Sequence, residues 1–174
     1  FGDDRAFEGM QEIAAHGLWT AGRVHVHRQT GWPWRATERY WELTGDPKAK
    51  AILDKILDAH KKLVGTTPLV SGHRGGTNWW FTQIYSRAAA MTALHTRDPR
   101  ALALCQTLAV GKEKRATYFC TLFAVCYHLT GDEKYKKALL GDGTGRSLLV
   151  VGNNGDFPAT AHWLVHQKPN PVRE

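Results

Sequence analysis

The fold is predicted from Leu43-Thr-Gly-Asp-Pro-Lys48, because this sequence recurs twice further along the chain. The later copies are His95-Thr-Arg-Asp-Pro-Arg100 and Leu129-Thr-Gly-Asp-Glu-Lys134. Glycine suits the left-handed end of one helix, aspartate suits the N-cap of the next, and proline suits its first position. Each copy therefore predicts a tight turn between two helices. Arg97 replaces the glycine in the second copy and fits a left-handed conformation less well.

Helical periodicity surrounds the three turns, since apolar side chains recur three and four residues apart. It predicts helices over residues 3–16, 34–43 and 47–63, and on both sides of the later turns. We expect loops at 18–34, 64–78 and 110–115, an irregular segment at 141–157 and a frayed end at 168–174. The chain is thus predicted to be one all-α domain over residues 1–174, built from repeated α-hairpins.

The composition is that of a folded, basic protein. Of the 174 residues 43% are hydrophobic and 22% are charged, with a net charge of +7 and a pI near 9.5. This balance favours acidic partners, but most lysines are mixed with acids on outer helices, so we expect no nucleic-acid partner. No apolar run approaches the roughly 18 residues of a membrane span, so we expect no membrane partner. Cys105, Cys120 and Cys126 lie in apolar helical runs, which predicts buried free thiols.

Two predicted loops share an unusual mixture of histidine, arginine and tryptophan without carboxylates. The first region contributes His25, His27, Arg28, Trp32, Trp34 and Arg35, and the second contributes His73, Arg74, Asn78, Trp79 and Trp80. Hairpin geometry brings both loops to one end of the array, where they would form a shared cleft. Tryptophan faces contact sugar rings, and arginine and histidine pair with carboxylates. The sequence therefore predicts binding of an acidic oligosaccharide or polysaccharide, while the structural alternative makes the tryptophans core residues.

The turn motifs also resemble a known group of enzymes. Tyr40-Trp-x-Leu-Thr-Gly-Asp-Pro-Lys48 and Cys126-Tyr-His-Leu-Thr-Gly-Asp-Glu-Lys-Tyr135 resemble the hairpins of (α/α) toroid carbohydrate enzymes. His25-x-His27 before Gly31-Trp-x-Trp34 is most similar to the toroid domain of rhamnogalacturonan exolyase-like or heparinase II/III-like polysaccharide lyases. The resemblance implies a partial or incomplete toroid, which a missing toroid portion or a β-sandwich domain would complete. It also implies an extracellular or periplasmic location.

β-Elimination from a uronic acid needs a cation for the carboxylate, a base for the C5 proton and an acid for the leaving oxygen. Arg28 or Arg74 would neutralise the carboxylate, and His27 or His73 would act as the base. Tyr40 or Tyr85 would protonate the leaving group. The sequence thus predicts a lyase-like module in preference to a glycoside hydrolase, which usually needs two carboxylates beside the scissile bond.

Other functions stay open at this level. A hydrolase would have to draw its acids from Glu38, Glu113, Asp142 and Asp156. A helical-repeat scaffold without catalysis is the third possibility. We expect no resident metal or cofactor, but a zinc or calcium ion stays open as an alternative, for example a zinc ion on His25, His27 and His73.

Overall fold

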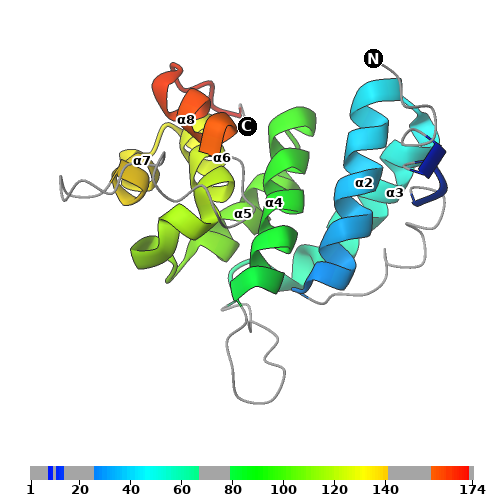
Figure 1. The fold of residues 1–174 in the computed structure, drawn as a ribbon, viewed down its shortest axis with the longest axis horizontal. Coiled ribbons are helices and arrows are strands. Elements are labelled where there is room, and N and C mark those ends of the chain that lie inside the picture. Colours follow the sequence, from blue (N-terminus) through cyan, green and yellow to red (C-terminus); the bar gives the residue numbers. More distant parts are fainter. Residues whose placement is uncertain (1–7, 10, 14–25, 67–78, 141–157, 173–174) are drawn as a thin grey trace. The chain divides into compact units, whose positions relative to one another are not determined.

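The computed structural model describes residues 8–9, 11–13, 26–66, 79–140 and 158–172 (Figure 1). Every regular element in these ranges is a helix, so the prediction of an all-α fold is confirmed. The elements are α2 (Arg28–Thr44), α3 (Pro47–His60), η1 (Lys61–Leu63), α4 (Trp79–Thr96), α5 (Pro99–Ala109), η2 (Glu113–Phe119), α6 (Cys120–Thr130), α7 (Glu133–Leu140) and α8 (Pro158–His166). Residues 8–9 and 11–13 are also helical. The predicted irregular segment 141–157 lies outside the described residues.

The three repeated turns have the geometry that their sequences predict. Gly45 and Gly131 adopt left-handed φ values of 67° and 73° after α2 and α6. Arg97 takes the same conformation after α4, with a φ of 54°, although it carries a side chain. Its backbone N–H donates to the carbonyl of Ala93 at 2.9 Å, as at a glycine helix end. The turn after α4 therefore has the same geometry as the other two, although arginine stands in place of glycine.

Aspartate and threonine close each turn in the same way. The side chains of Asp46 and Asp98 accept from the backbone N–H two residues later at 2.8 Å, and Asp132 does so at 3.0 Å. The threonine that precedes each aspartate by two residues accepts from the aspartate N–H at 3.1 Å. Its hydroxyl also donates to the carbonyl four residues earlier. The threonine thus ties the end of one helix to the N-cap of the next.

Helix α2 begins six residues earlier than predicted. Residues 28–34 were expected in a loop because glycine and proline lie among them, but they form the first two turns of the helix. The His27 side chain is the N-cap, since its Nδ1 accepts from the Gln29 N–H at 3.3 Å. Pro33 lies inside the helix and lacks a backbone donor, while its carbonyl accepts from the Thr37 hydroxyl at 2.9 Å.

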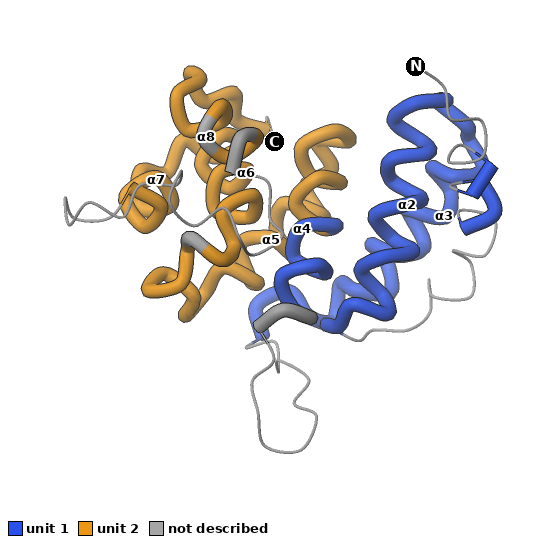
Figure 2. The backbone as a smooth tube through the Cα atoms, in the orientation of Figure 1, with its two compact units in different colours: residues 1–88 blue, residues 89–174 orange. Residues whose placement is uncertain are grey.

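The chain forms two compact units, residues 1–88 and 89–174, with the boundary inside α4 (Figure 2). In unit 1 the interior is built around three rings from three helices. Trp34 of α2 lies 5.3 Å from the ring of His60 and 5.4 Å from the ring of Tyr85. His60 and Tyr85 lie 5.5 Å apart, and all three side chains are almost fully buried. This aromatic cluster joins α2, α3 and the first half of α4.

In unit 2 the core is built around α6, which packs against α5, α7 and α8. Nearly every residue of α6 is buried, which agrees with its uniformly apolar sequence. Cys105, Cys120 and Cys126 are buried free thiols, as predicted. Burial raises the pKa of the Cys105 and Cys126 thiols, so both stay protonated at neutral pH.

The segment after α8 is bonded to the core and is not frayed over residues 168–172. The backbone N–H of Asn170 donates to the carbonyl of His128 at 2.8 Å, and that of Val172 donates to Leu129 at 3.0 Å. These carbonyls belong to the last turn of α6, which has no partners for them within its own helix. The segment therefore satisfies a helix end, a contact that composition does not predict.

Among the described residues, no helix combines the length and the apolar character that crossing a bilayer requires.

Candidate functional site

Helix α2 carries a stripe of basic and aromatic side chains on one face. Arg28, Trp32, Arg35 and Arg39 are spaced four, three and four residues apart, which places them on the same side of an α-helix. We call these four residues the α2 stripe. Arg28 and Arg39 are exposed, and Trp32 keeps 57% of its surface exposed. An indole this open to water in the middle of three arginines has the properties of a ligand platform.

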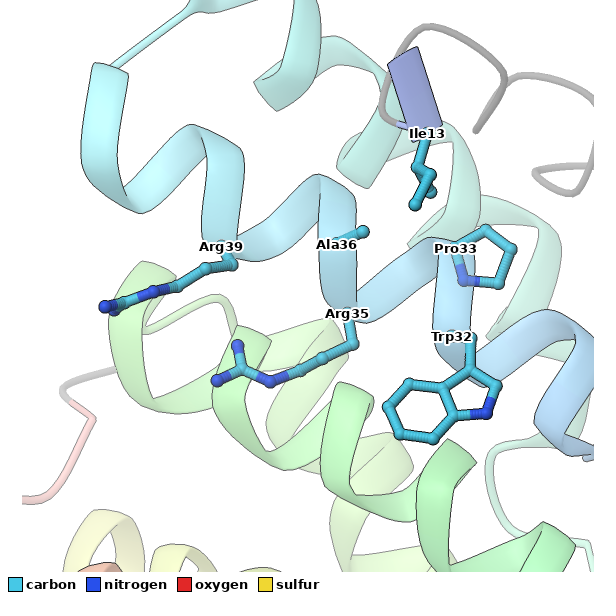
Figure 3. Close-up of a pocket in the computed structure, with 6 residues that line it drawn as sticks. All are labelled: Ile13, Trp32, Pro33, Arg35, Ala36 and Arg39. Atoms are coloured by element: carbon cyan, nitrogen blue, oxygen red, sulfur yellow. The ribbon is translucent and has the colours of Figure 1, made fainter. Parts of the chain in front are cut away.

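A pocket of about 590 Å³ lies along the stripe (Figure 3). Its lining residues are Ile13, Trp32, Pro33, Arg35, Ala36 and Arg39. Five of the six come from successive turns of α2, and Ile13 comes from the N-terminal helical residues. Figure 3 shows the Arg35 and Arg39 side chains extending in the same direction from neighbouring turns. The walls of the pocket are thus mostly carbon atoms, and its cationic groups are the guanidinium groups of Arg35 and Arg39.

Arg35 is the buried cation of this site. It forms an ion pair with Glu38, whose side chain is completely buried, while the Arg35 side chain is 19% exposed. Burial, together with the nearby charges of Arg87 and Arg39, lowers the pKa of Arg35 to about 10. Arg35 is therefore still protonated at neutral pH. Its positive charge is retained in a place where water stabilises it poorly.

Arg39 is the exposed cation. Its Nη1 donates to Oε2 of Glu42 at 2.5 Å across one turn of α2. The Arg39 side chain is 46% exposed and the Glu42 side chain 29% exposed. Pairs of this kind contribute little to stability, on the order of 0.2–1 kcal/mol, because water and salt screen them. Arg39 can therefore change partners at small cost.

His27 is placed next to the stripe, at the N-cap of α2. Its Nδ1 accepts a hydrogen bond from the helix, so in the neutral ring Nε2 carries the proton. This tautomer can donate a hydrogen bond to a ligand but cannot remove a proton from one. The base role that the sequence suggests for His27 therefore conflicts with its capping role.

Three predicted site residues lie in the interior instead. Trp34 and Tyr85 have no exposed surface, and Tyr40 is 8% exposed. Trp34 and Tyr85 belong to the aromatic cluster of unit 1, and Tyr40 packs with Ala49 and Trp41. As placed, Trp34 cannot stack on a sugar, and neither tyrosine can reach a leaving group. The interior takes them because α2 has two faces, and residues 34 and 32 lie on opposite sides of it.

Most of the second loop of the predicted cleft lies outside the residues that the structure describes. His25, His73, Arg74 and Asn78 lie outside the described residues, as does most of the loop 64–78. Trp79 and Trp80 form the first turn of α4, and only their backbone is described. A zinc site on His25, His27 and His73 would need two residues of this group.

The two helices that would carry the cleft do start side by side. Gly31 in the first turn of α2 faces the backbone of Ile84 and Tyr85 in the second turn of α4. A Cβ atom on Gly31 would lie 2.8 Å from the Tyr85 nitrogen. This close approach concerns the two helices themselves, and the shared cleft stays a prediction.

The structure excludes Glu38 as one of the catalytic acids of a hydrolase. Glu38 is buried and paired with Arg35, so it cannot flank a scissile bond. Glu113 is exposed and accepts from the Gly111 N–H at 3.2 Å. Asp142 and Asp156 lie outside the described residues.

Two residues of the site were missed at the level of sequence. The sequence analysis assigns no role to Arg39 or Glu42, because the predicted site loop ended at Trp34. The signal was available in the spacing of Trp32, Arg35 and Arg39, which becomes a stripe once the helix is known to begin at Arg28.

Comparisons of the chain with protein-family models, with curated proteins and with solved structures find no match. What the chain does must therefore be inferred from the α2 stripe and its pocket.

Proposed function

We propose that the chain binds an acidic oligosaccharide along the α2 stripe, with one sugar ring on Trp32 and anionic groups at the arginines. The observation that carries this proposal is the exposed indole of Trp32 in a carbon-lined pocket shared with Arg35 and Arg39. An indole face contacts the apolar face of a sugar ring, and a guanidinium pairs with a carboxylate through two parallel hydrogen bonds.

The net charge of +7 supports an anionic ligand over a neutral one, since it raises the rate of encounter. Arg35 supports it further. The charges of Arg39 and Arg87 both act unfavourably on the charge of Arg35, and an anionic group in the pocket would offset this repulsion. A neutral sugar would give only the stacking contact.

We also propose that the chain is part of a toroid and that it cleaves the bound oligosaccharide by β-elimination. Elimination would use Arg28 or Arg35 for the carboxylate, and His27 in its present tautomer would act as a hydrogen-bond donor. The base would then be His73. Binding needs only described residues, so it is the function that the geometry supports best.

The test is titration of the protein with uronic-acid oligomers by calorimetry, with a neutral glucose oligomer of equal length as the control. Oligogalacturonate, oligoalginate and hyaluronan oligomers form a suitable panel. We expect heat of binding from at least one acidic oligomer, none from the neutral oligomer, and weaker binding as salt is added. Equal binding of the neutral oligomer, or no binding by any acidic one, would contradict the proposal.

The same samples test elimination. Each elimination product carries a conjugated double bond that absorbs in the near ultraviolet. A rise in absorbance would support a lyase, and new reducing ends without absorbance would support a hydrolase. Binding with neither signal would support a binding module.

A further inference from the structure

Arg35 and Arg39 have carboxylate partners of different kinds. Glu38, the partner of Arg35, has no exposed surface and is held in the interior of unit 1. Glu42, the partner of Arg39, keeps 29% of its side chain exposed. Arg39 lines the pocket, whereas Glu42 is not among its lining residues. Glu42 therefore holds the pocket's exposed cation from outside the pocket.

An anionic ligand and Glu42 need the same group. Nη1 of Arg39 already donates to Glu42 at 2.5 Å. A ligand carboxylate that pairs with Arg39 through the edge that carries this N–H would have to displace Glu42, and one that pairs through another edge would still bind a guanidinium whose charge Glu42 already offsets. A ligand carboxylate at Arg39 would also be repelled by the carboxylate of Glu42, because like charges that share one cation lie close together. Glu42 opposes the ligand in both ways.

We propose that Glu42 is an internal competitor for the anion site at Arg39, and that it limits how tightly the α2 stripe holds an acidic ligand. This inference rests on the proposed function. Glu42 is in this view a specificity-determining residue. Its carboxylate occupies Arg39 when the site is empty and moves off when an anion arrives. Weakly charged or neutral ligands leave the Arg39–Glu42 pair in place.

Glu42→Gln tests the inference, because it keeps the shape of the side chain and removes its charge. With the acidic oligomer that binds wild type best as the probe, we expect the affinity to rise by about 1.4- to 5-fold, the range set by the strength of an exposed ion pair. The rise should depend on Arg39. We therefore expect the double variant Arg39→Gln, Glu42→Gln to bind the probe no more tightly than the single variant Arg39→Gln.

Asp58→Asn is the matched control. Asp58 and Lys61 form an exposed pair three residues apart at 2.8 Å, like Arg39 and Glu42, but they lie on α3 and η1 and do not line the pocket. The substitution changes the net charge by the same amount. We expect it to leave the affinity unchanged within error. Thermal unfolding of each variant shows whether it is folded.

The outcomes separate this inference from the proposed function. If wild type binds an acidic oligomer and Glu42→Gln binds it no more tightly, the competitor role is wrong and the binding function stands. An equal gain with Asp58→Asn, or a gain that persists without Arg39, would assign the effect to net charge and overturn the role. If no variant binds any acidic oligomer, both are wrong.

Discussion

Gly31 allows two helices of unit 1 to approach each other more closely than any other residue would. A Cβ atom at this position would lie 2.8 Å from the Tyr85 nitrogen and 2.9 Å from its Cα, both backbone atoms that cannot rotate away. In most helices glycine to alanine gains about 1 kcal/mol. Here we expect Gly31→Ala to lower the free energy of unfolding by about 1–3 kcal/mol, the usual cost of overpacking. Thermal or urea denaturation measures the change.

Gly9→Ala is the control for this prediction. Gly9 is also helical, but no heavy atom lies within 4 Å of a Cβ placed on it. We expect this variant to be as stable as wild type or slightly more stable. If Gly31→Ala behaves in the same way, the close approach of α2 to α4 is wrong.

His60 makes unit 1 sensitive to acid. Its Nδ1 lies 2.6 Å from the Ile56 carbonyl, and its Nε2 is buried without a hydrogen-bond partner beside Trp34 and Tyr85. Burial lowers the pKa of His60 below its ordinary value of 6.5, and Lys62 adds to the shift. Above that value both the folded and the unfolded chain hold a neutral ring. Below it the His60 ring binds a proton in the unfolded chain but not in the folded chain, so the free energy of unfolding decreases as the pH is lowered.

The prediction is a loss of stability between pH 7 and pH 5 that depends on residue 60. His60→Phe keeps an aromatic ring and removes the titrating group. We expect its free energy of unfolding to change less over this pH range than that of wild type. Some dependence should remain, because burial and Arg97 also lower the pKa of His128. Equal slopes for the two proteins, measured by urea denaturation, would show that His60 is not responsible.

At the scale of elements, Arg97 joins a helix end to the C-terminal segment. Its side chain donates to the carbonyl of Asn170 at 2.5 Å and to that of Pro171 at 3.0 Å. The backbone strain of a left-handed arginine costs on the order of 1–2 kcal/mol. The two bonds offset part of that cost. Arginine at position 97 therefore strains the turn after α4 but binds the C-terminal segment to it.

Two substitutions separate these effects. Arg97→Ala keeps the strained φ and loses both bonds, so it should be the less stable variant. Arg97→Gly loses the bonds but relaxes the turn, so it should lie closer to wild type. In both we expect faster hydrogen exchange at the amides of Asn170 and Val172, which bond to α6. Unchanged exchange at these two amides would show that Arg97 does not hold the segment.

Much of this element structure could be predicted from sequence. The helix-turn-helix pattern follows from Thr-x-Asp and a left-handed position, because these residues satisfy the helix ends locally. The start of α2 could not be predicted, since Gly31 and Pro33 read as breakers. The need for glycine at position 31 comes from Ile84 and Tyr85 of α4, which lie more than fifty residues further on. The attachment of the C-terminal segment also depends on partners far away in the sequence, on α6 and at Arg97.

At the scale of the whole molecule, the candidate site was predicted in part. The sequence located Arg28, Trp32 and Arg35 of the α2 stripe, and the acidic ligand stays a prediction. It could not separate Trp32 from Trp34, because in a loop both may face a ligand, whereas on a helix only one can. For the same reason Tyr40 and Tyr85 looked available for chemistry and lie in the interior.

In the proposed binding mode Trp32 is the platform for a sugar ring, and Trp163 provides the matched comparison. Trp163 of α8 is 58% exposed, against 57% for Trp32, but it belongs to unit 2 and lines no part of the pocket. Calorimetric titration of wild type, Trp32→Ala and Trp163→Ala with the best acidic oligomer tests the claim directly. Since stacking on an aromatic side chain contributes on the order of 1–2 kcal/mol, we predict an affinity about ten-fold lower for Trp32→Ala and unchanged for Trp163→Ala. Equal affinities for Trp32→Ala and wild type, or an equal loss in both variants, would contradict it.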